Sequence, residues 1–305
     1  MTKGTPLPRR GLFKAGVAVS TAVLLPAVTA SAASATERAG LRGPEGELRD
    51  LEQRYAARLG VYARNVRTGQ VVAHRAQERF AMCSTFKAFT AAAILRDDDR
   101  CSPLDEVIHY PPADLLPNSP ISGQHVDTGM TVGDLCAAAI QYSDNTAGNL
   151  LLRQIGGPAG LTRFFRSVGD PVSRLDRWET ALNTAVPGDL RDTTTPEAIG
   201  RSFEGLTLGR ALGDTDRRQL VTWLEGNTTS GERFRAGLPR DWVVADKTGT
   251  GDYATANDIG VAWTRRNTPI VLAVLSSKAT QDAPVDNTLI ASAARILART
   301  LATGE

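Results

Sequence analysis

The chain has 305 residues, 42% of them hydrophobic, which is enough to bury one large core or two moderate ones. Its 35 basic and 33 acidic residues leave a net charge of +2 and are scattered along the chain, so nucleic acid and anionic membrane surfaces are not indicated as partners. Three cysteines, Cys83, Cys101 and Cys136, are too few for a disulfide framework, and their odd number leaves at least one free thiol.

Residues 1–35 have the pattern of an export signal. Arg9-Arg10 precedes the apolar stretch Ala15–Ala30, and small residues follow as Ala30-Ser31-Ala32 or Ala33-Ser34-Ala35. A basic start, an apolar run and an A-x-A site are typical of secretory signals, and paired arginines favour the twin-arginine route. The run is shorter than the ~20 apolar residues that span a bilayer, which argues against a membrane anchor. We therefore expect a mature protein that is secreted (extracellular or periplasmic) without stable membrane association.

The next segments predict a helix followed by a hairpin. Leucines and a tyrosine recur at three- and four-residue steps between Pro44 and Leu59, which indicates an amphipathic helix. The strand-like runs Val61–Val66 and Val71–His74 follow, separated by Arg67-Thr68-Gly69-Gln70, which is typical of a turn between paired strands.

Helical patterns dominate the middle of the chain, and strand patterns return near its end. The clearest helices are expected at Phe86–Leu95, Val132–Gln141 and Thr146–Ile155, and a last one at Asn287–Leu301. Strands are expected at Trp242–Asp246, Ile259–Thr264 and Ile270–Ser276.

Strands at both ends and helices between them predict an α/β (α+β) fold with an inserted all-helical domain. The two ends of the chain should meet in one antiparallel sheet flanked by the terminal helices. We assign residues 36–75 and 225–305 to this α/β domain and residues 76–224 to the helical domain.

Ser84 and Lys87 are the first pair of residues that indicate chemistry. Residues three apart share a face of a helix, so the ammonium of Lys87 can reach the Ser84 hydroxyl, which needs a neighbouring base to become a nucleophile. At a helix N-terminus the Ser84 N–H also points where an oxyanion could sit. The alternative is an ordinary serine cap followed by a solvated lysine.

Two further motifs are ambiguous when each is taken alone. Ser143-Asp144-Asn145 lies between two predicted helices, where it would serve as a helix cap. Lys247-Thr248-Gly249 follows the strand Trp242–Asp246, where a lysine is usually solvated and a glycine permits close backbone approach.

The order and spacing of these motifs, together with Trp178-Glu179-Thr180, resemble those of class A serine β-lactamases. The resemblance extends from about Glu37 to the C-terminus. It implies a β-lactamase/transpeptidase-like three-layer α/β/α sandwich with the active site between the two domains. It also implies hydrolysis of the β-lactam amide bond, and hence resistance to β-lactam antibiotics, by a monomer that acts on small molecules.

The resemblance implies a role for each motif residue. Ser84 would form the acyl-enzyme, and Ser143 would pass a proton to the lactam nitrogen. Asn145 would hold the substrate's side-chain amide. The substrate carboxylate and the oxyanion would be bound by the strand residues Lys247, Thr248, Gly249 and Thr250, the last through its N–H together with that of Ser84.

Glu179 distinguishes a hydrolase from a protein that only binds penicillin. It lies in a segment with few apolar residues, expected to be an Ω-loop at about 177–192, with Arg177 and Asp192 paired across the neck. By resemblance, Glu179 and Asn183 hold the water that attacks the acyl-enzyme. Either Lys87 or Glu179, acting through water, could deprotonate Ser84.

The substrate carboxylate needs a second cation in this family. Many relatives place an arginine on the strand after Lys-Thr-Gly, but this chain has Ala256 there. Arg233 matches the alternative location used by some actinobacterial relatives, although an arginine is by default a surface residue. One carbapenem-hydrolysing subgroup joins the cysteine next to its nucleophile to a second cysteine. Here Cys83 is present but Gly251 stands at the matching position, so poor carbapenem turnover is expected.

Other functions fit the sequence less well. It has no G-x-S-x-G motif, and its three histidines are too widely spaced for H-x-H or H-E-x-x-H, so neither a metal nor another cofactor is expected. The remaining alternatives are a D,D-peptidase and a penicillin-binding sensor that acylates without efficient turnover. A sensor would have no need of Glu179 and Asn183.

Overall fold

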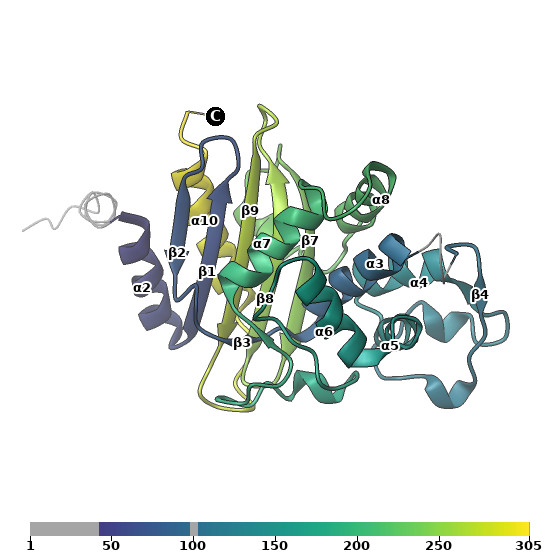
Figure 1. Ribbon diagram of the computed structural model, residues 1–305. Coiled ribbons are helices and arrows are strands. Elements are labelled where there is room, and N and C mark those ends of the chain that lie inside the picture. Colours follow the sequence, from purple (N-terminus) through teal and green to yellow (C-terminus); the bar gives the residue numbers. More distant parts are fainter. Residues whose placement is uncertain (1–42, 98–102, 305) are drawn as a thin grey trace, which may run out of the picture.

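The computed structural model describes residues 43–97 and 103–304 (Figure 1). Five antiparallel strands form one sheet in the order β2-β1-β9-β8-β7. The strands are β1 (Arg58–Asn65), β2 (Val71–His74), β7 (Val243–Gly251), β8 (Thr255–Trp263) and β9 (Pro269–Ser277). Because β1 pairs with β9, segments from the two ends of the chain meet in the sheet. The predicted α/β fold with an antiparallel sheet is confirmed.

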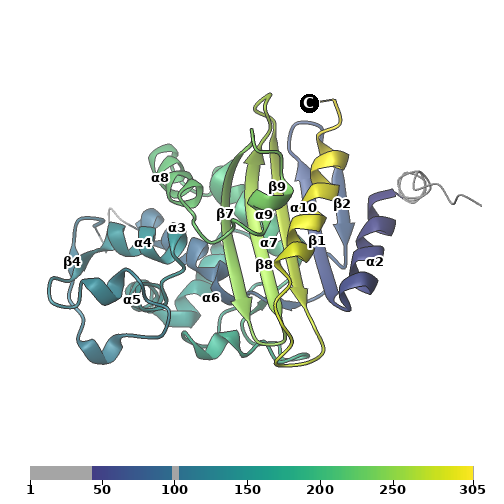
Figure 2. The same cartoon turned by 180° about the vertical axis from the view of Figure 1, so that it is seen from behind.

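Both faces of this sheet are covered by helices. On one face lie α2 (Gly43–Tyr55) and α10 (Asn287–Leu301), as Figure 2 shows, and on the other lies α7 (Pro196–Thr207). The side chains of β9 alternate between the two faces of the sheet, so this strand contributes to a core on each face. Val271, Ala273 and Leu275 belong to the core that contains α7, whereas Ile270, Leu272 and Val274 belong to the core with α2 and α10.

The helices beside the sheet surround α3 (Phe86–Asp97), in which every residue from Phe86 to Leu95 is buried. A helix that is buried on all sides needs small or apolar residues all round, and this one contains four alanines. The Phe89 ring packs against those of Phe165 and Phe203, with centroids 4.9 Å and 6.1 Å apart. The segment that follows Ser84 is therefore held rigidly in the core.

The remaining elements are short strands and further helices. Two small antiparallel ladders pair β3 (Phe80–Ala81) with β6 (Thr193–Thr194) and β4 (Val107–Ile108) with β5 (Met130–Thr131). The other α-helices are α4 (Val132–Gln141), α5 (Asn145–Gln154), α6 (Gly157–Ser167), α8 (Asp214–Glu225) and α9 (Phe234–Gly237), and the 3₁₀ helices are η1 (Cys83–Thr85), η2 (Pro112–Asp114), η3 (Ser122–Gln124) and η4 (Ala181–Thr184).

Several predicted boundaries are wrong, among them the start of β8, which is Thr255 and not Ile259. The first helix ends at Tyr55 and not at Leu59, because Ala56 adopts a left-handed conformation (φ 46°) and β1 begins at Arg58. The strand expected to end at Asp246 continues to Gly251, so Lys247-Thr248-Gly249 lies within β7 and pairs with β8. Its polar side chains interrupted the strand pattern, but they are buried.

The predicted export signal and Cys101 lie outside the described residues. Within the part of the chain that is described, no helix is long and apolar enough to cross a membrane.

Candidate active site

Ser84 lies in η1, immediately before α3. The preceding Cys83 has a left-handed backbone (φ 46°), and Ser84 itself is only 7% exposed. Lys87, one turn further on, donates from Nζ to Ser84 Oγ at 3.0 Å. The predicted contact between the two side chains is therefore present, although the α-helix begins at Phe86 and Ser84 belongs to the 3₁₀ turn before it.

Lys87 connects three parts of the site. Its Nζ donates to the Ser143 carbonyl (2.8 Å) and to Asn145 Oδ1 (2.7 Å), and forms an ion pair with Glu179 Oε1 at 3.0 Å. Burial lowers the pKa of Lys87, while the charge of Glu179 acts in the opposite direction. A lysine whose pKa is lowered in this way is better able to accept a proton from a nearby hydroxyl.

The close packing around Lys87 depends on a glycine of α5. A Cβ on Gly148 would lie 2.8 Å from Lys87 Cε, so a larger residue there would push the lysine stem aside. The absence of that side chain lets α5 approach α3.

Glu179 lies against both Ser84 and Asn183. The Ser84 hydroxyl donates to Glu179 Oε1 at 3.2 Å, and Asn183 Nδ2 donates to Oε2 at 2.6 Å. Glu179 is only 6% exposed. One carboxylate therefore faces the hydroxyl of Ser84 with one oxygen and an amide with the other, which suits a base that holds a water between them.

Asn149 is a site residue that sequence reasoning missed. Its Oδ1 accepts the Glu179 N–H at 3.0 Å and its Nδ2 donates to the Glu179 carbonyl at 3.1 Å, so it fixes the backbone of that residue. The available signal was its position four residues after Asn145, which places both side chains on one face of α5.

Ser143-Asp144-Asn145 forms the entry to α5. Ser143 is left-handed (φ 56°), and its Oγ accepts from Lys247 Nζ at 3.1 Å. Asp144 caps the helix by accepting the Ala147 N–H, and it also accepts from the Ser122 hydroxyl. The capping expected from the sequence is present, while the neighbouring serine points toward Lys247.

Lys247 is fully buried at the sheet edge that faces Ser84. Burial, reinforced by the charge of Lys87, lowers the pKa of Lys247 to about 7. The adjacent Gly249 is required by packing, because a Cβ there would lie 2.8 Å from the Met82 carbonyl oxygen. The glycine thus lets the segment that carries Ser84 approach β7 closely, in agreement with the close backbone approach expected from the sequence.

Arg233 is a buried residue, 6% exposed, so the alternative of a surface arginine is wrong. Its Nη2 donates to Thr250 Oγ1 at 2.7 Å and its Nη1 to the Gly249 carbonyl at 2.8 Å. Burial lowers the pKa of Arg233. Ala256, opposite Thr250 in the β7–β8 register, supplies no charge of its own. The Arg233 guanidinium therefore lies next to the end of β7.

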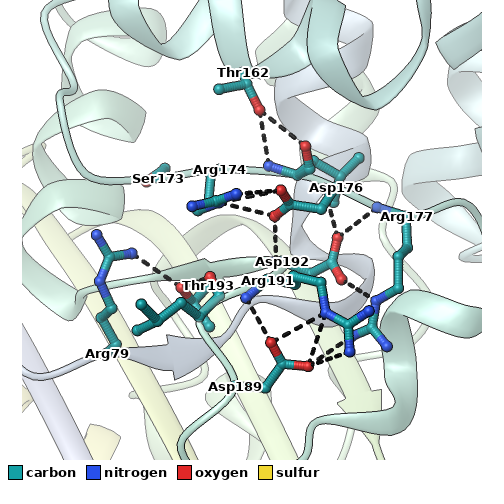
Figure 3. Close-up of polar contacts among 12 residues, drawn as sticks. Arg79, Thr162, Ser173, Arg174, Asp176, Arg177, Asp189, Arg191, Asp192 and Thr193 are labelled. Atoms are coloured by element: carbon teal, nitrogen blue, oxygen red, sulfur yellow. Dashed lines mark hydrogen bonds and ion pairs between the residues drawn. The ribbon is translucent and has the colours of Figure 1, made fainter.

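The segment that carries Glu179 is fastened at its neck by charged side chains (Figure 3). Arg177 Nε donates to Asp192 Oδ2 at 2.5 Å, which is the pairing expected from the sequence. The other oxygen, Asp192 Oδ1, accepts the N–H groups of Asp176 and Arg177 at 2.7 and 2.9 Å. Since the Asp192 side chain is fully buried, this carboxylate joins the two ends of the loop.

Cys83 is next to Ser84 but is not positioned as a nucleophile. Burial raises the pKa of its thiol, and the nearby charge of Glu179 raises it further. Cys136 is likewise a buried thiol. Among the described residues, no group of three or more histidine, cysteine or acidic side chains is arranged to hold a metal ion.

The chain is similar to known proteins over most of its length. A model of the Beta-lactamase enzyme family matches residues 44–301. The chain is 50% identical to a β-lactamase of Streptomyces fradiae over 99% of both chains. It is 52% identical to the carbapenem-hydrolysing β-lactamase KPC of Klebsiella oxytoca, over 81% of this chain and 85% of the relative. A solved structure of the class A β-lactamase of the last common ancestor of Gram-negative bacteria superimposes with a TM-score of 0.82 at 50% identity, covering 84% of this chain and 98% of that one.

Proposed function

We propose that Ser84 attacks the lactam carbonyl to form an acyl-enzyme, because the chain belongs to the class A β-lactamases. Proteins of this family hydrolyse β-lactam antibiotics, and this chain therefore does so and confers resistance to them. Two groups that could take the Ser84 proton lie within reach of its Oγ: Glu179 Oε1 at 3.2 Å, and Lys87 Nζ at 3.0 Å once the ammonium has lost a proton. Both routes of activation therefore remain open. The N–H groups of Ser84 and Thr250 would stabilise the oxyanion.

Ser143 would deliver a proton to the lactam nitrogen as the ring opens. Its Oγ contacts Lys247 Nζ, and its carbonyl contacts Lys87 Nζ, so both lysines are coupled to it. Lys247, Thr248, Gly249 and Thr250 follow one another on β7. This segment would bind the substrate carboxylate, assisted by the charge of Arg233. Asn145 would hold the side-chain amide of the substrate.

Deacylation would depend on Glu179, and the observation that carries the proposal is the position of its carboxylate. One oxygen faces Ser84, where the acyl group would be attached, and the other is held by Asn183 at 2.6 Å. A water between these groups could lose its proton to Glu179 while attacking the ester. No similarity found favours the alternatives, a D,D-peptidase or a penicillin-binding sensor.

The test is the variant Glu179→Gln, which retains the shape of the side chain but cannot take a proton from water. Incubation with benzylpenicillin should leave an adduct with the mass of one penicillin, because deacylation slows more than acylation. Ser84→Ala is the control and should acquire no adduct. Wild-type turnover by Glu179→Gln, without an adduct, would overturn the assignment of Glu179 as the base.

We further propose that the mature protein is a monomer of two domains, residues 36–75 with 225–305 and residues 76–224, that is exported by the twin-arginine route. The export proposal rests on Arg9-Arg10 and the apolar run after them. Replacing both arginines by lysine should retain the protein in the cytoplasm, whereas unchanged secretion would exclude this route. Light scattering of the purified protein would measure its mass in solution.

A further inference from the structure

A cavity of about 570 Å³ lies between the Ω-loop and the sheet, apart from the catalytic residues. Its walls are the loop segment 185–189, the strand β3 with the residues before it, and the turn after β9. Ser84, Lys87 and Glu179 are not among the described residues that line it. Its volume is in the range of about 300–1,000 Å³ typical of small-molecule pockets.

Five basic side chains line the cavity, and four of them are paired with carboxylates. Arg58 pairs with Glu78, Arg177 with Asp192, Arg191 with Asp189, and Lys278 with Asp286.

Arg79 is the fifth cation, and its charge is not neutralised. Among the described residues it forms no ion pair. Its Nη1 donates to Thr193 Oγ1 (2.9 Å, Figure 3) and to the Val172 carbonyl (3.2 Å). Its Nε and Nη2 make no hydrogen bond to any part of the chain that is described. A planar guanidinium with two available donors is suited to a carboxylate or sulfonate.

The rest of the lining supplies apolar surface next to this charge. Phe80, Val186 and Pro187 contribute to the walls, and Val186 is 45% exposed although it is apolar. We propose that this cavity, defined by Arg79 and the loop segment 185–189, binds a small aromatic monoanion, an aryl carboxylate or aryl sulfonate. The acid group would lie against Arg79 and the ring against the apolar wall.

The test uses 2-naphthalenesulfonate as the probe, with the neutral 2-naphthalenesulfonamide as the matched ligand. Isothermal titration calorimetry of the wild-type protein should show saturable binding of one sulfonate and markedly weaker binding of the sulfonamide. Arg79→Gln should raise the dissociation constant of the sulfonate about tenfold to a hundredfold, as expected for the loss of a charge-assisted hydrogen bond. Absence of saturable binding to the wild-type protein would overturn the proposal.

A second pair of variants removes any dependence on the folding of Arg79→Gln. Val186→Asp places a negative charge in the cavity wall and should weaken sulfonate binding. Leu190→Asp makes the same change on the same loop at a side chain that is 58% exposed and does not line the cavity, and should leave binding unchanged. Equal affinities in the two variants would place the probe elsewhere, for example in the catalytic site, and would refute the assignment. The outcome is independent of the roles proposed for Ser84 and Glu179.

Discussion

Lys87 and Lys247 are both fully buried, and both project toward Ser143 from different elements. Burial lowers the pKa of each, and the charge of Lys87 lowers that of Lys247 further. The effect of burial on Lys87 is opposed by its ion pair with Glu179, whereas Lys247 has no carboxylate within ion-pair distance among the described residues. The two lysines thus differ in how readily they remain charged.

This difference predicts a pH dependence of catalysis. Lys247 is protonated below its pKa of about 7 and can then attract the substrate carboxylate, and it becomes neutral as the pH rises. Because kcat/KM reports the free enzyme, kcat/KM for benzylpenicillin should fall as the pH rises through about 7. Lys247→Arg stays protonated and should not show that fall. If kcat/KM of the arginine variant falls over the same pH range, the fall is caused by the titration of another group.

Arg233 leads to a second prediction at the level of a single residue. If its charge supports carboxylate binding, Arg233→Ala should raise KM and lower kcat/KM by about tenfold to a hundredfold, the effect of losing a charge-assisted hydrogen bond. Because Arg233 also binds the carbonyls of Gly249 and Asn257, the melting temperature of the variant must be measured alongside. Wild-type kinetics in a folded variant would reduce the arginine to a structural role.

Gly251 leads to a prediction about carbapenems. A Cβ at this position would lie 2.8 Å from Cys83 Sγ and 2.6 Å from the Asn183 carbonyl oxygen, so the position is too crowded for a larger residue without some rearrangement. A glycine has no thiol and cannot form a disulfide with Cys83. The bridge expected of one carbapenem-hydrolysing subgroup is therefore missing. We predict that steady-state imipenem hydrolysis is much slower than benzylpenicillin hydrolysis. Comparable kcat/KM values for the two substrates would contradict this.

At the level of elements, the Ω-loop contains little regular structure, with only η4 between Arg177 and Asp192. Its position is fixed by side chains at the neck and by Asn149, which binds the backbone of Glu179 from α5. The loop can therefore hold Glu179 accurately only while these contacts persist.

Removing the neck charge should destabilise the loop and slow catalysis together. Asp192→Asn leaves Arg177 without its buried partner, a change that costs about 3 kcal/mol in comparable pairs, and should lower kcat through displacement of Glu179. Arg191→Gln is the matched control, because Arg191 is solvent-exposed and its ion pair with Asp189 should contribute much less to stability. Urea unfolding of both variants measures the difference. Equal losses of stability would show that the buried carboxylate is not the main fastening of the loop.

At the level of the whole molecule, the site is assembled from distant parts of the chain. Lys247 on β7 and Ser143 before α5 are 104 residues apart, and Glu179 is 95 residues from Ser84. The sheet brings segments from both ends of the chain together (Figure 1), and the 3₁₀ turn η1, which carries Ser84 and leads into the buried helix α3, packs against the edge strand β7.

The sequence alone determined the elements with strong periodicity and the contact within the first motif. Val132–Gln141 and Asn287–Leu301 were predicted with the bounds that the structure has, because an apolar face recurring every three or four residues is a local property. The contact of Lys87 with Ser84 was likewise predictable, since residues three apart lie on one face both in a 3₁₀ turn and in an α-helix.

The tertiary structure decided which polar residues are buried and which partners they meet. The extension of β7 through Lys247, the burial of Arg233 and the role of Asn149 all depend on contacts with residues far along the chain. A polar side chain looks locally like the end of a strand or a solvated surface group. Only when a distant carbonyl, hydroxyl or carboxylate compensates for lost hydration can it lie in the interior, and the position of that partner is a property of the fold.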